Sequence, residues 1–273
     1  MQYINLDGKI VAAITAGLPA DNGAFRYGYG LFETMLVQGG VVRLAQYHWQ
    51  RLFEGLGKLG FELPARFTAS YLQQQVLALA ATNGAAALCR VRLQVYAAGG
   101  GLYGRDRRPG FVIECFGLEP DTMQLNENGL VAGIAQGLQK SPDSLANLKT
   151  CNALIYAMAA RQAQDSQWND ALVCNTAGHI IESTIANIFW IKGDEVYTPP
   201  LTDGCIAGVM RRHTMAMLPV TECSLTPQAL LEADEVFLTN AIKKIRWVGR
   251  VGDKEYGNRR IMQVSDKALS YTF

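Results

Sequence analysis

The amino-acid sequence predicts an α+β fold in which many strands pair antiparallel. Asp7-Gly8 and Gln38-Gly39-Gly40 each stand between two short apolar stretches, and glycine at such places favours a tight β-hairpin. Three further apolar stretches, Asp170–Cys174, His179–Trp190 and Glu195–Thr198, follow one another with only short turns between them. Apolar residues with helical spacing occur between these groups of strands. The class is therefore mixed α and β.

The first part of the chain combines two hairpins with two helices. We expect one hairpin over Ile4–Val11 and another between Leu31–Val37 and Val41–Leu44. Leu44–Leu59 is predicted as a helix because four of its residues fall close to one face, namely Leu44, His48, Arg51 and Leu52. The other expected elements are a helix at Ala69–Ala81 and strands at Cys89–Tyr96 and Phe111–Phe116.

The second part begins with a strand at Leu130–Ile134 and a helix at about Asn152–Ala163. After the three strands named above, we expect a helix starting near Gly208, a short helix opened by Thr226-Pro227, and a strand at Glu235–Leu238. The polar stretch around 119–128 is predicted to separate two domains. We expect an N-terminal α/β domain at residues 1–120, a linker at 121–129 and a larger C-terminal domain at 130–273.

Composition excludes several classes of function. The formal net charge of +1 gives no reason to expect nucleic acid or a membrane surface as partner. Apolar runs stay well short of the roughly 20 residues that span a bilayer, and Asp7 and Lys9 make the N-terminus unlike a signal peptide. The six cysteines are scattered without a Cys-x-x-Cys pair, and the three histidines lie far apart. We therefore expect no metal site and a cytoplasmic location.

One glycine motif is rejected as a cofactor site. Gly99-Gly100-Gly101-Leu102-Tyr103-Gly104 matches the dinucleotide-binding pattern G-x-G-x-x-G and follows a predicted strand. That pattern binds a pyrophosphate only when a helix follows, because the phosphates sit at the helix N-terminus. Here Arg105–Pro109 and another strand follow. We interpret the segment as a flexible loop between two strands.

Two isolated charges are the stronger signal. Lys149 is the only charged side chain between residues 143 and 161, and Glu182 is the only one between residues 170 and 192. A buried lysine is costly unless it is paired or used chemically, and burial lowers its pKa toward that of a nucleophilic amine. Two simpler interpretations are that the two residues form a salt bridge with each other, or that one of them reaches solvent.

A third feature of the sequence, an expected anion site, accompanies Lys149 and Glu182. Gly204–Arg211 is predicted to run from a loop into a helix, and the free backbone N–H groups of such a helix start form an anion site. A Schiff-base lysine, a carboxylate and a phosphate cradle are what a pyridoxal 5′-phosphate site requires. The carboxylate keeps the pyridine nitrogen protonated, so that the ring can accept electrons from the substrate Cα.

With these residues the sequence resembles the class IV pyridoxal phosphate enzymes, also called fold type IV. They comprise branched-chain aminotransferases, D-amino acid aminotransferases and aminodeoxychorismate lyases. The resemblance implies a smaller N-terminal α/β domain, a larger C-terminal domain with an antiparallel pseudo-barrel, and a homodimer with the cofactor between the domains. The matching motifs, in chain order, are Phe25 to Thr34, His48-x-x-Arg51-Leu52, Lys149-Thr150-Cys151-Asn152, Glu182-x-x-x-x-Asn187-Ile188-Phe189, Tyr197-Thr198-Pro199-Pro200, Gly208-Val209-Met210-Arg211 and Glu235 to Ala241.

The resemblance also implies a role for each residue. Lys149 would be the catalytic residue, which binds pyridoxal phosphate as a Schiff base and moves the proton at the substrate Cα. Glu182 would bind the pyridine nitrogen, and Arg51 would bind the phosphate; without the resemblance, a solvated helix charge is the simpler interpretation of Arg51. Five further residues would bind the cofactor, with the phosphate contacts coming largely from their backbone: Gly208, Val209, Met210, Asn240 and Ala241.

The reaction is less sharply defined. Lys149-x-x-Asn152 has the spacing of D-amino acid aminotransferases and lyases, yet Gly23 and Ala98 stand where lyases usually carry arginines for substrate carboxylates. A transaminase acting on a small amino acid and a 2-oxo acid is our first expectation, and a lyase releasing pyruvate from aminodeoxychorismate is the second. A catalytically silent relative is the third, which the retention of both Lys149 and Glu182 opposes. The residues expected to bind substrate are Tyr29 and Tyr96; the cations able to replace the missing arginines are Arg90, Arg92, Lys243, Lys244 and Arg246.

Overall fold

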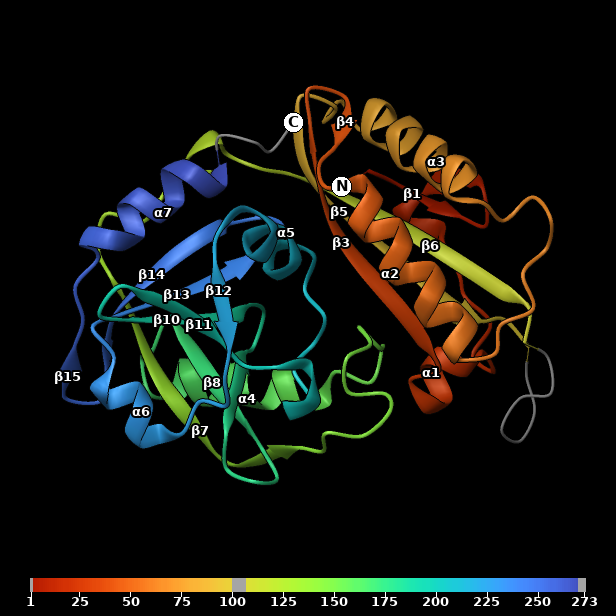
Figure 1. The fold of residues 1–273 in the computed structure, drawn as a ribbon. Coiled ribbons are helices and arrows are strands. Elements are labelled where there is room, and N and C mark those ends of the chain that lie inside the picture. Colours follow the sequence, from red (N-terminus) through yellow and green to blue (C-terminus); the bar gives the residue numbers. More distant parts are fainter. Residues whose placement is uncertain (1, 100–106, 270–273) are drawn as a thin grey trace. The chain divides into compact units, whose positions relative to one another are not determined.

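Two β-sheets organise the chain, which divides into two compact units. The computed structural model describes residues 2–99 and 107–269 (Figure 1). Unit 1 comprises Met1–Thr122 and Leu148–Asn152, and unit 2 comprises Met123–Asn147 and Ala153–Phe273. None of the helices in the described part of the chain combines the length and the apolar character that a membrane-spanning segment needs.

The segment Leu148–Asn152 belongs to unit 1, whereas the sequence-based division assigned it to the second part of the chain. Its backbone explains the difference. The N–H of Phe32 donates to the carbonyl of Lys149 at 2.9 Å, and the N–H of Cys151 donates to the carbonyl of Gly30, also at 2.9 Å. Lys149 is therefore fixed to the strand that contains Gly30 and Phe32.

Unit 1 is built on a six-stranded antiparallel sheet in the order β2-β1-β6-β5-β3-β4. Both predicted hairpins are present, and the first turns through Asp7 and Gly8 with φ of 51° and 89°, as a two-residue hairpin requires. The strands are β1 (Tyr3–Leu6), β2 (Lys9–Ala12), β3 (Gly30–Gln38), β4 (Val41–Val42), β5 (Leu88–Ala97) and β6 (Pro109–Gly117).

Helices α2 (Ala45–Lys58) and α3 (Ala69–Thr82) pack on one face of this sheet, as Figure 1 shows. Apolar side chains of β3, β5, β6 and both helices form the core between them, including Met35, Leu52 and Leu72. Because successive strand residues point to opposite faces, the other face carries the alternate residues of β3 and β5. Two shorter helices not predicted from the sequence are η1 (Ala13–Thr15) and α1 (Gly23–Tyr27).

Unit 2 contains a barrel, which confirms the predicted fold class. Its sheet runs β12-β11-β10-β13-β14-β7-β8-β9, and β9 pairs back with β10 where Asn187 lies opposite Glu182. This pairing closes β10, β13, β14, β7, β8 and β9 into a ring, in which β7 runs parallel to both neighbours. The bounds are β7 (Leu130–Lys140), β8 (Asp170–Asn175), β9 (Ile180–Ser183), β10 (Asn187–Lys192), β11 (Glu195–Thr198), β12 (Val220–Glu222), β13 (Glu235–Asn240), β14 (Lys244–Val251) and β15 (Lys254–Glu255).

The helices of unit 2 lie outside the barrel core. Helix α4 (Leu154–Asp165) packs on β7 and β8, and α5 (Val209–Met217) packs on β13. Thr226 caps α6 (Pro227–Glu232), as predicted, by accepting a hydrogen bond from the N–H of Ala229 at 3.1 Å. The remaining helical elements are η2 (Pro120–Met123), η3 (Leu201–Asp203) and α7 (Arg259–Leu269).

One strand prediction was wrong. His179–Trp190, expected as a single strand, is two antiparallel strands, β9 and β10. The chain reverses because the N–H of Ser183 bonds to the carbonyl of Ala186 at 2.7 Å, and the N–H of Ala186 bonds to the hydroxyl of Ser183 at 3.2 Å. Most of the Gly99–Gly104 motif lies outside the described residues, and the flanking strands β5 and β6 pair antiparallel.

Candidate functional site

A buried carboxylate on β3 holds two cationic or ionisable side chains of α2. Glu33 accepts bonds from Arg51 Nε at 2.8 Å and Arg51 Nη2 at 2.5 Å, a two-point contact. Its Oε2 also lies 2.6 Å from His48 Nδ1. His48 and Arg51 are three residues apart in α2, so both face the same strand. The predicted cofactor residue Arg51 is thus fixed in position by Glu33.

The charges of this cluster follow from its burial. Burial raises the pKa of Glu33, but the positive charge of Arg51 and the contacts with His48 outweigh it and hold this pKa at about 2. Burial lowers the pKa of His48, against the opposing effect of Glu33. His48 is therefore neutral and donates from Nδ1 to Glu33. Its Nε2 is buried and has no partner among the described residues.

Lys149 lies beside an aromatic ring in the same unit. Its Nζ is 4.5 Å from the centre of the Phe32 ring, and Arg92 Cζ is 3.8 Å from the same centre. Both are within the range of cation–π contacts. Burial lowers the pKa of Arg92, while the nearby Cys151 and Glu114 oppose this change. The Phe32 ring therefore carries the reactive lysine candidate and a half-buried arginine together.

The two predicted substrate residues have different surroundings in unit 1. Tyr29 packs its ring at 5.3 Å from that of Phe61, and its hydroxyl donates to the carbonyl of Leu59 at 2.6 Å. Tyr96 alternates with the core residues of β5 and so shares the sheet face of Arg92. Burial raises the pKa of Tyr96 to about 12, with a smaller contribution from Asp7. Tyr96 therefore lies on the same sheet face as Arg92, whereas Tyr29 packs against the core of unit 1.

Glu182 forms a second buried cluster, in unit 2. Its Oε1 accepts bonds from Lys140 Nζ at 2.9 Å and from the Tyr156 hydroxyl at 2.7 Å, and Lys140 also bonds to that hydroxyl at 2.6 Å. Glu182 is almost completely buried, with 4 % of its side chain exposed. Burial, followed by the charge of Glu182, raises the pKa of Tyr156. Lys140 is therefore the cation that balances Glu182.

The same carboxylate is tied to the loop that leads into α5. Glu182 Oε2 accepts the N–H of Ile206 at 2.9 Å, and the carbonyl of Ile206 accepts the side-chain amide of Asn187 at 2.9 Å. Gly208 follows at the start of the helix, where a Cβ would overlap the side-chain oxygen of Asn187. A Cβ would therefore force the Asn187 side chain to move, so glycine preserves its contact with Ile206, whose N–H ties Glu182 to the loop before the helix.

The start of α5 and a hydroxyl on β13 form a set of unused donors. The first backbone N–H groups of a helix lack acceptors within it, and no side chain caps this one. The hydroxyl of Thr239, on the strand against which α5 packs, is buried without a partner in the part of the chain that the structure describes. Helix N–H groups and a buried hydroxyl fit a phosphate group. Val209 and Met210 supply the first two of these N–H groups.

Asn240 ends β13, and Ala241 begins the turn that leads into β14. The side-chain oxygen of Asn240 accepts the N–H groups of Ile242 at 3.0 Å and Lys243 at 2.7 Å. This bonding closes the turn and fixes its backbone. Within β13, Asn240 points to the opposite face from Thr239.

Four residues of these clusters were not singled out from the sequence. Lys140 lies just before the stretch in which Lys149 stood alone, and Tyr156 lies within it as an uncharged residue. Glu33 and Thr239 fall inside motifs that matched but carried no predicted role. A search for polar residues at alternate positions of buried strands would have drawn attention to Glu33 and Thr239.

The chain is similar over most of its length to several known proteins. The chain is 27 % identical over 249 residues to an aminodeoxychorismate lyase of Vibrio harveyi, covering 87 % of this chain and 89 % of that protein. It is also 27 % identical over 272 residues to a putative branched-chain-amino-acid aminotransferase of Methanocaldococcus jannaschii, covering 97 % and 93 %. A branched-chain aminotransferase structure from Thermoproteus uzoniensis, solved with norvaline, superimposes with a TM-score of 0.88 at 23 % identity, covering 99 % and 93 %.

A model of one protein family matches this chain. The model for amino-transferase class IV matches residues 30–251, which is most of the chain. Enzymes of this family use pyridoxal phosphate, and the family includes both aminotransferases and aminodeoxychorismate lyases. The chain therefore belongs to the class IV aminotransferase family.

Proposed function

We propose that this protein is a pyridoxal 5′-phosphate-dependent aminotransferase, which transfers the amino group of a small amino acid to a 2-oxo acid. The proposed substrates are of the branched-chain or D-amino acid type. The observation that carries this choice is the placement of Lys149 and Arg92 against the same Phe32 ring. It puts an amine and a carboxylate-binding guanidinium together, and this pair suits an amino acid.

Unit 1 supplies the reactive amine. Pyridoxal phosphate, when bound, provides a ring that accepts electrons from the substrate Cα. Lys149 would hold it covalently and would move the proton at that carbon. His48 and Arg51 are positioned by Glu33, and Arg51 provides positive charge for the phosphate.

Unit 2 supplies the carboxylate and the phosphate donors. Glu182 holds a proton on the ring nitrogen, and Lys140 and Tyr156 keep its carboxylate in position. The N–H groups of Val209 and Met210 and the backbone of Asn240-Ala241 bind the phosphate. The unpartnered hydroxyl of Thr239 supports this assignment, because a buried hydroxyl without a partner is costly.

The substrate carboxylate is assigned to Arg92. Gly23 and Ala98 offer no charge where lyases usually carry arginines, and a Cβ on Gly23 would come within 2.9 Å of the Ala97 Cβ. Arg90 stacks at 4.7 Å on Phe116, a different ring from the one beside Lys149. Tyr96 shares the sheet face of Arg92 and is proposed to contact the same substrate. Tyr29 stays a weaker candidate, because its hydroxyl already bonds to Leu59.

An aminodeoxychorismate lyase is the second candidate. The similarity to the Vibrio harveyi lyase and the spacing from Lys149 to Asn152 favour it. Such a substrate carries two carboxylates, whereas one arginine accompanies Lys149 at Phe32. Both reactions begin with removal of the Cα proton by Lys149, so the two proposals share the cofactor and most site residues.

The cofactor assignment is tested by visible absorbance. Purified wild-type protein, with cofactor added, should absorb in the visible range, and Lys149→Ala should lose the absorbance of the covalent form. Lys9→Ala, a change at an exposed lysine of β2, is the matched control and should absorb like wild type. A colourless wild-type protein would refute the proposal.

The substrate assignment is tested by steady-state kinetics. L-Leucine, L-glutamate and D-alanine are offered with 2-oxoglutarate, and pyruvate release from aminodeoxychorismate is measured separately. Arg92→Gln should raise KM for the active amino acid by about ten-fold or more, the effect of losing one charged hydrogen bond. Arg90→Gln should leave KM within about two-fold. Turnover of aminodeoxychorismate alone would favour the lyase.

We also place the protein in the cytoplasm as a homodimer, as the family resemblance implies. Six cysteines without a disulfide partner support a reducing compartment. Light scattering on the purified protein tests the dimer, and a mass of twice 29.9 kDa is the expected result.

A further inference from the structure

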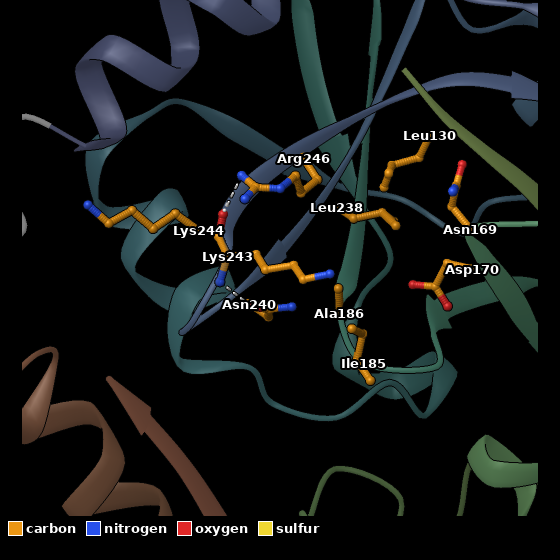
Figure 2. Close-up of a pocket in the computed structure, with 10 residues that line it drawn as sticks. All are labelled: Leu130, Asn169, Asp170, Ile185, Ala186, Leu238, Asn240, Lys243, Lys244 and Arg246. Carbon is orange, nitrogen blue, oxygen red and sulfur yellow. Dashed lines mark hydrogen bonds between the residues drawn. The ribbon is translucent and has the colours of Figure 1, made fainter. Parts of the chain in front are cut away.

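A small pocket opens in unit 2 at one end of the barrel. It has a volume of about 160 Å³ and lies where β7, β8 and β13 meet the turn leading into β14 (Figure 2). Leu238, which belongs to the barrel core, and Leu130, which packs against it, form an apolar wall. Leu238 and Asn240 face this pocket, whereas Thr239, between them, points to the other face of β13. The side chains of the pocket thus lie on the opposite face of β13 from Thr239, and the pocket shares only Asn240 with the residues proposed to bind the phosphate.

One side of the pocket ends in a fixed carboxylate. Asp170 is buried, with 7 % of its surface exposed. Its Oδ1 accepts the N–H of Ala171 at 2.8 Å, the hydroxyl of Thr184 at 2.6 Å and the N–H of Thr184 at 3.3 Å. All of its hydrogen bonds within the described residues end on Oδ1. Oδ2 is therefore able to accept a bond from a bound molecule.

The other side carries positive charge. Figure 2 shows the side chain of Lys243 extending into the pocket from the side opposite Asp170. The backbone of Lys243 is fixed, because its N–H donates to Asn240 at 2.7 Å and its carbonyl accepts from Arg246 Nη1 at 2.9 Å. Within the described residues, Lys243 and Asp170 do not form an ion pair with each other. Arg246 adds a second cation at the same side.

We propose that this pocket binds a small zwitterionic amino acid, with its ammonium on Asp170 and its carboxylate on Lys243. A simple anion would meet the negative charge of Asp170, and a simple cation would meet Lys243 and Arg246. A molecule that carries both charges satisfies both sides, and the wall of Leu130 and Leu238 accepts a short apolar side chain. The volume restricts the ligand to a small amino acid.

The inference is tested by calorimetric titration of the full-length protein. The probes are glycine, L-alanine, D-alanine and β-alanine, with acetate and ethylammonium as singly charged controls. At least one zwitterion should bind at least ten-fold more tightly than either control. Asp170→Asn and Lys243→Met should each weaken that binding by about ten-fold or more, the loss of one charge-assisted hydrogen bond. Lys9→Met, a change at an exposed lysine of unit 1, should bind as wild type does.

Lys149→Ala separates this site from the proposed active site. Binding of the zwitterion to this variant, prepared without added cofactor, should match wild type, whatever the outcome of the cofactor test. Binding that Lys149→Ala abolishes and that Asp170→Asn and Lys243→Met leave intact would overturn the inference. Equal binding of acetate, or no binding by any zwitterion, would overturn it as well. Lys243→Met guards against a folding defect in Asp170→Asn, because Lys243 is exposed.

Discussion

Glu33 in unit 1 and Glu182 in unit 2 are both buried carboxylates, but their partners differ. Glu33 in unit 1 is bound at two points by Arg51 and at one point by His48. Glu182 in unit 2 is bound by Lys140, by Tyr156 and by a backbone N–H. In the first cluster both partners lie on one helix, α2. In the second they lie on β7, on α4 and in the loop before α5.

The difference shows which group each cluster holds in place. The two-point contact with Glu33 orients the guanidinium of Arg51, so Glu33 positions the arginine. Around Glu182 three separate donors converge on the carboxylate, so these partners position Glu182. A buried charge of either kind costs several kcal/mol unless it is paired in this way. The comparison therefore predicts different consequences when each carboxylate is neutralised.

Neutralising Glu182 should have the largest effect. Glu182→Gln leaves Lys140 without a counter-charge, and breaking a buried pair costs about 3–5 kcal/mol. The melting temperature of the apo protein should therefore fall by about 10 °C, as a differential scanning measurement would show. If Glu182 holds a proton on the cofactor ring, kcat should also fall on the order of 100-fold or more.

Glu62→Gln is the matched control for this prediction. Glu62 pairs with Arg107 at 2.7 Å, but both side chains are more than half exposed. Exposed pairs contribute about 0–1 kcal/mol, so the melting temperature should change by under about 3 °C. Equal losses in the two variants would show that Lys140 does not need Glu182 for stability.

Neutralising Glu33 should have a smaller and pH-dependent effect. The folded-state pKa of Glu33 is about 2, below its ordinary value of 4.5. A carboxyl with a depressed pKa stabilises the folded state above the unfolded pKa, and this stabilisation is lost as the pH falls from about 4.5 to about 2. It amounts to on the order of 3 kcal/mol at pH 7. Glu33→Gln should therefore be destabilised at pH 7.

The acid dependence distinguishes this variant from a general folding defect. Between pH 6 and pH 3 the melting temperature of wild type should fall more than that of Glu33→Gln, because the variant has already lost the Glu33 contribution. His48 adds a loss below about pH 6.5 in both proteins, since burial depresses its pKa in each and only wild type has the opposing charge of Glu33. Parallel curves for the two proteins over this range would contradict the assignment of a charged Glu33.

The sequence predicted local features of the fold better than it predicted these clusters. The turns at Asp7-Gly8 and Gly39-Gly40 follow from local conformation, since all four residues have positive φ. The break between β9 and β10 escaped prediction because it depends on hydrogen bonds of Ser183 with Ala186 inside an apolar run. The hydrophobic pattern alone does not show such a reversal.

In the candidate site, too, locally visible features could be predicted from the sequence and contacts between distant residues could not. Lys149 and Glu182 stood out because no charge surrounds them in the sequence. The pairing of Glu182 with Lys140 depends on a shift of register between β7 and β8, which occurs between Ile134 and Gln139 and sets where Lys140 lies. No sequence spacing gives that register. Partners that are distant in sequence were therefore missed, while residues that stand alone in the sequence, such as Lys149 and Glu182, could be singled out as candidates.

The smallest predicted effect concerns the unpartnered hydroxyl of Thr239. Thr239→Val keeps the shape of the side chain and removes a buried group that has no partner among the described residues. The melting temperature of the apo protein should stay the same or rise, because an unsatisfied buried hydroxyl is destabilising. If the hydroxyl binds the cofactor phosphate, the Kd for pyridoxal phosphate should increase about five- to ten-fold, as fluorescence titration would measure.

Thr198→Val is the matched control in the same unit, because the hydroxyl that it removes has a hydrogen-bond partner. Thr198 is fully buried like Thr239, but its hydroxyl donates to the carbonyl of Ile188 at 2.9 Å. Its replacement should lower the melting temperature by a few degrees and leave the affinity for pyridoxal phosphate unchanged, since a satisfied bond within the barrel is lost. If Thr239→Val instead lowered stability and left affinity intact, the hydroxyl would be structural. The start of α5 would then bind the phosphate through its backbone N–H groups without help from β13.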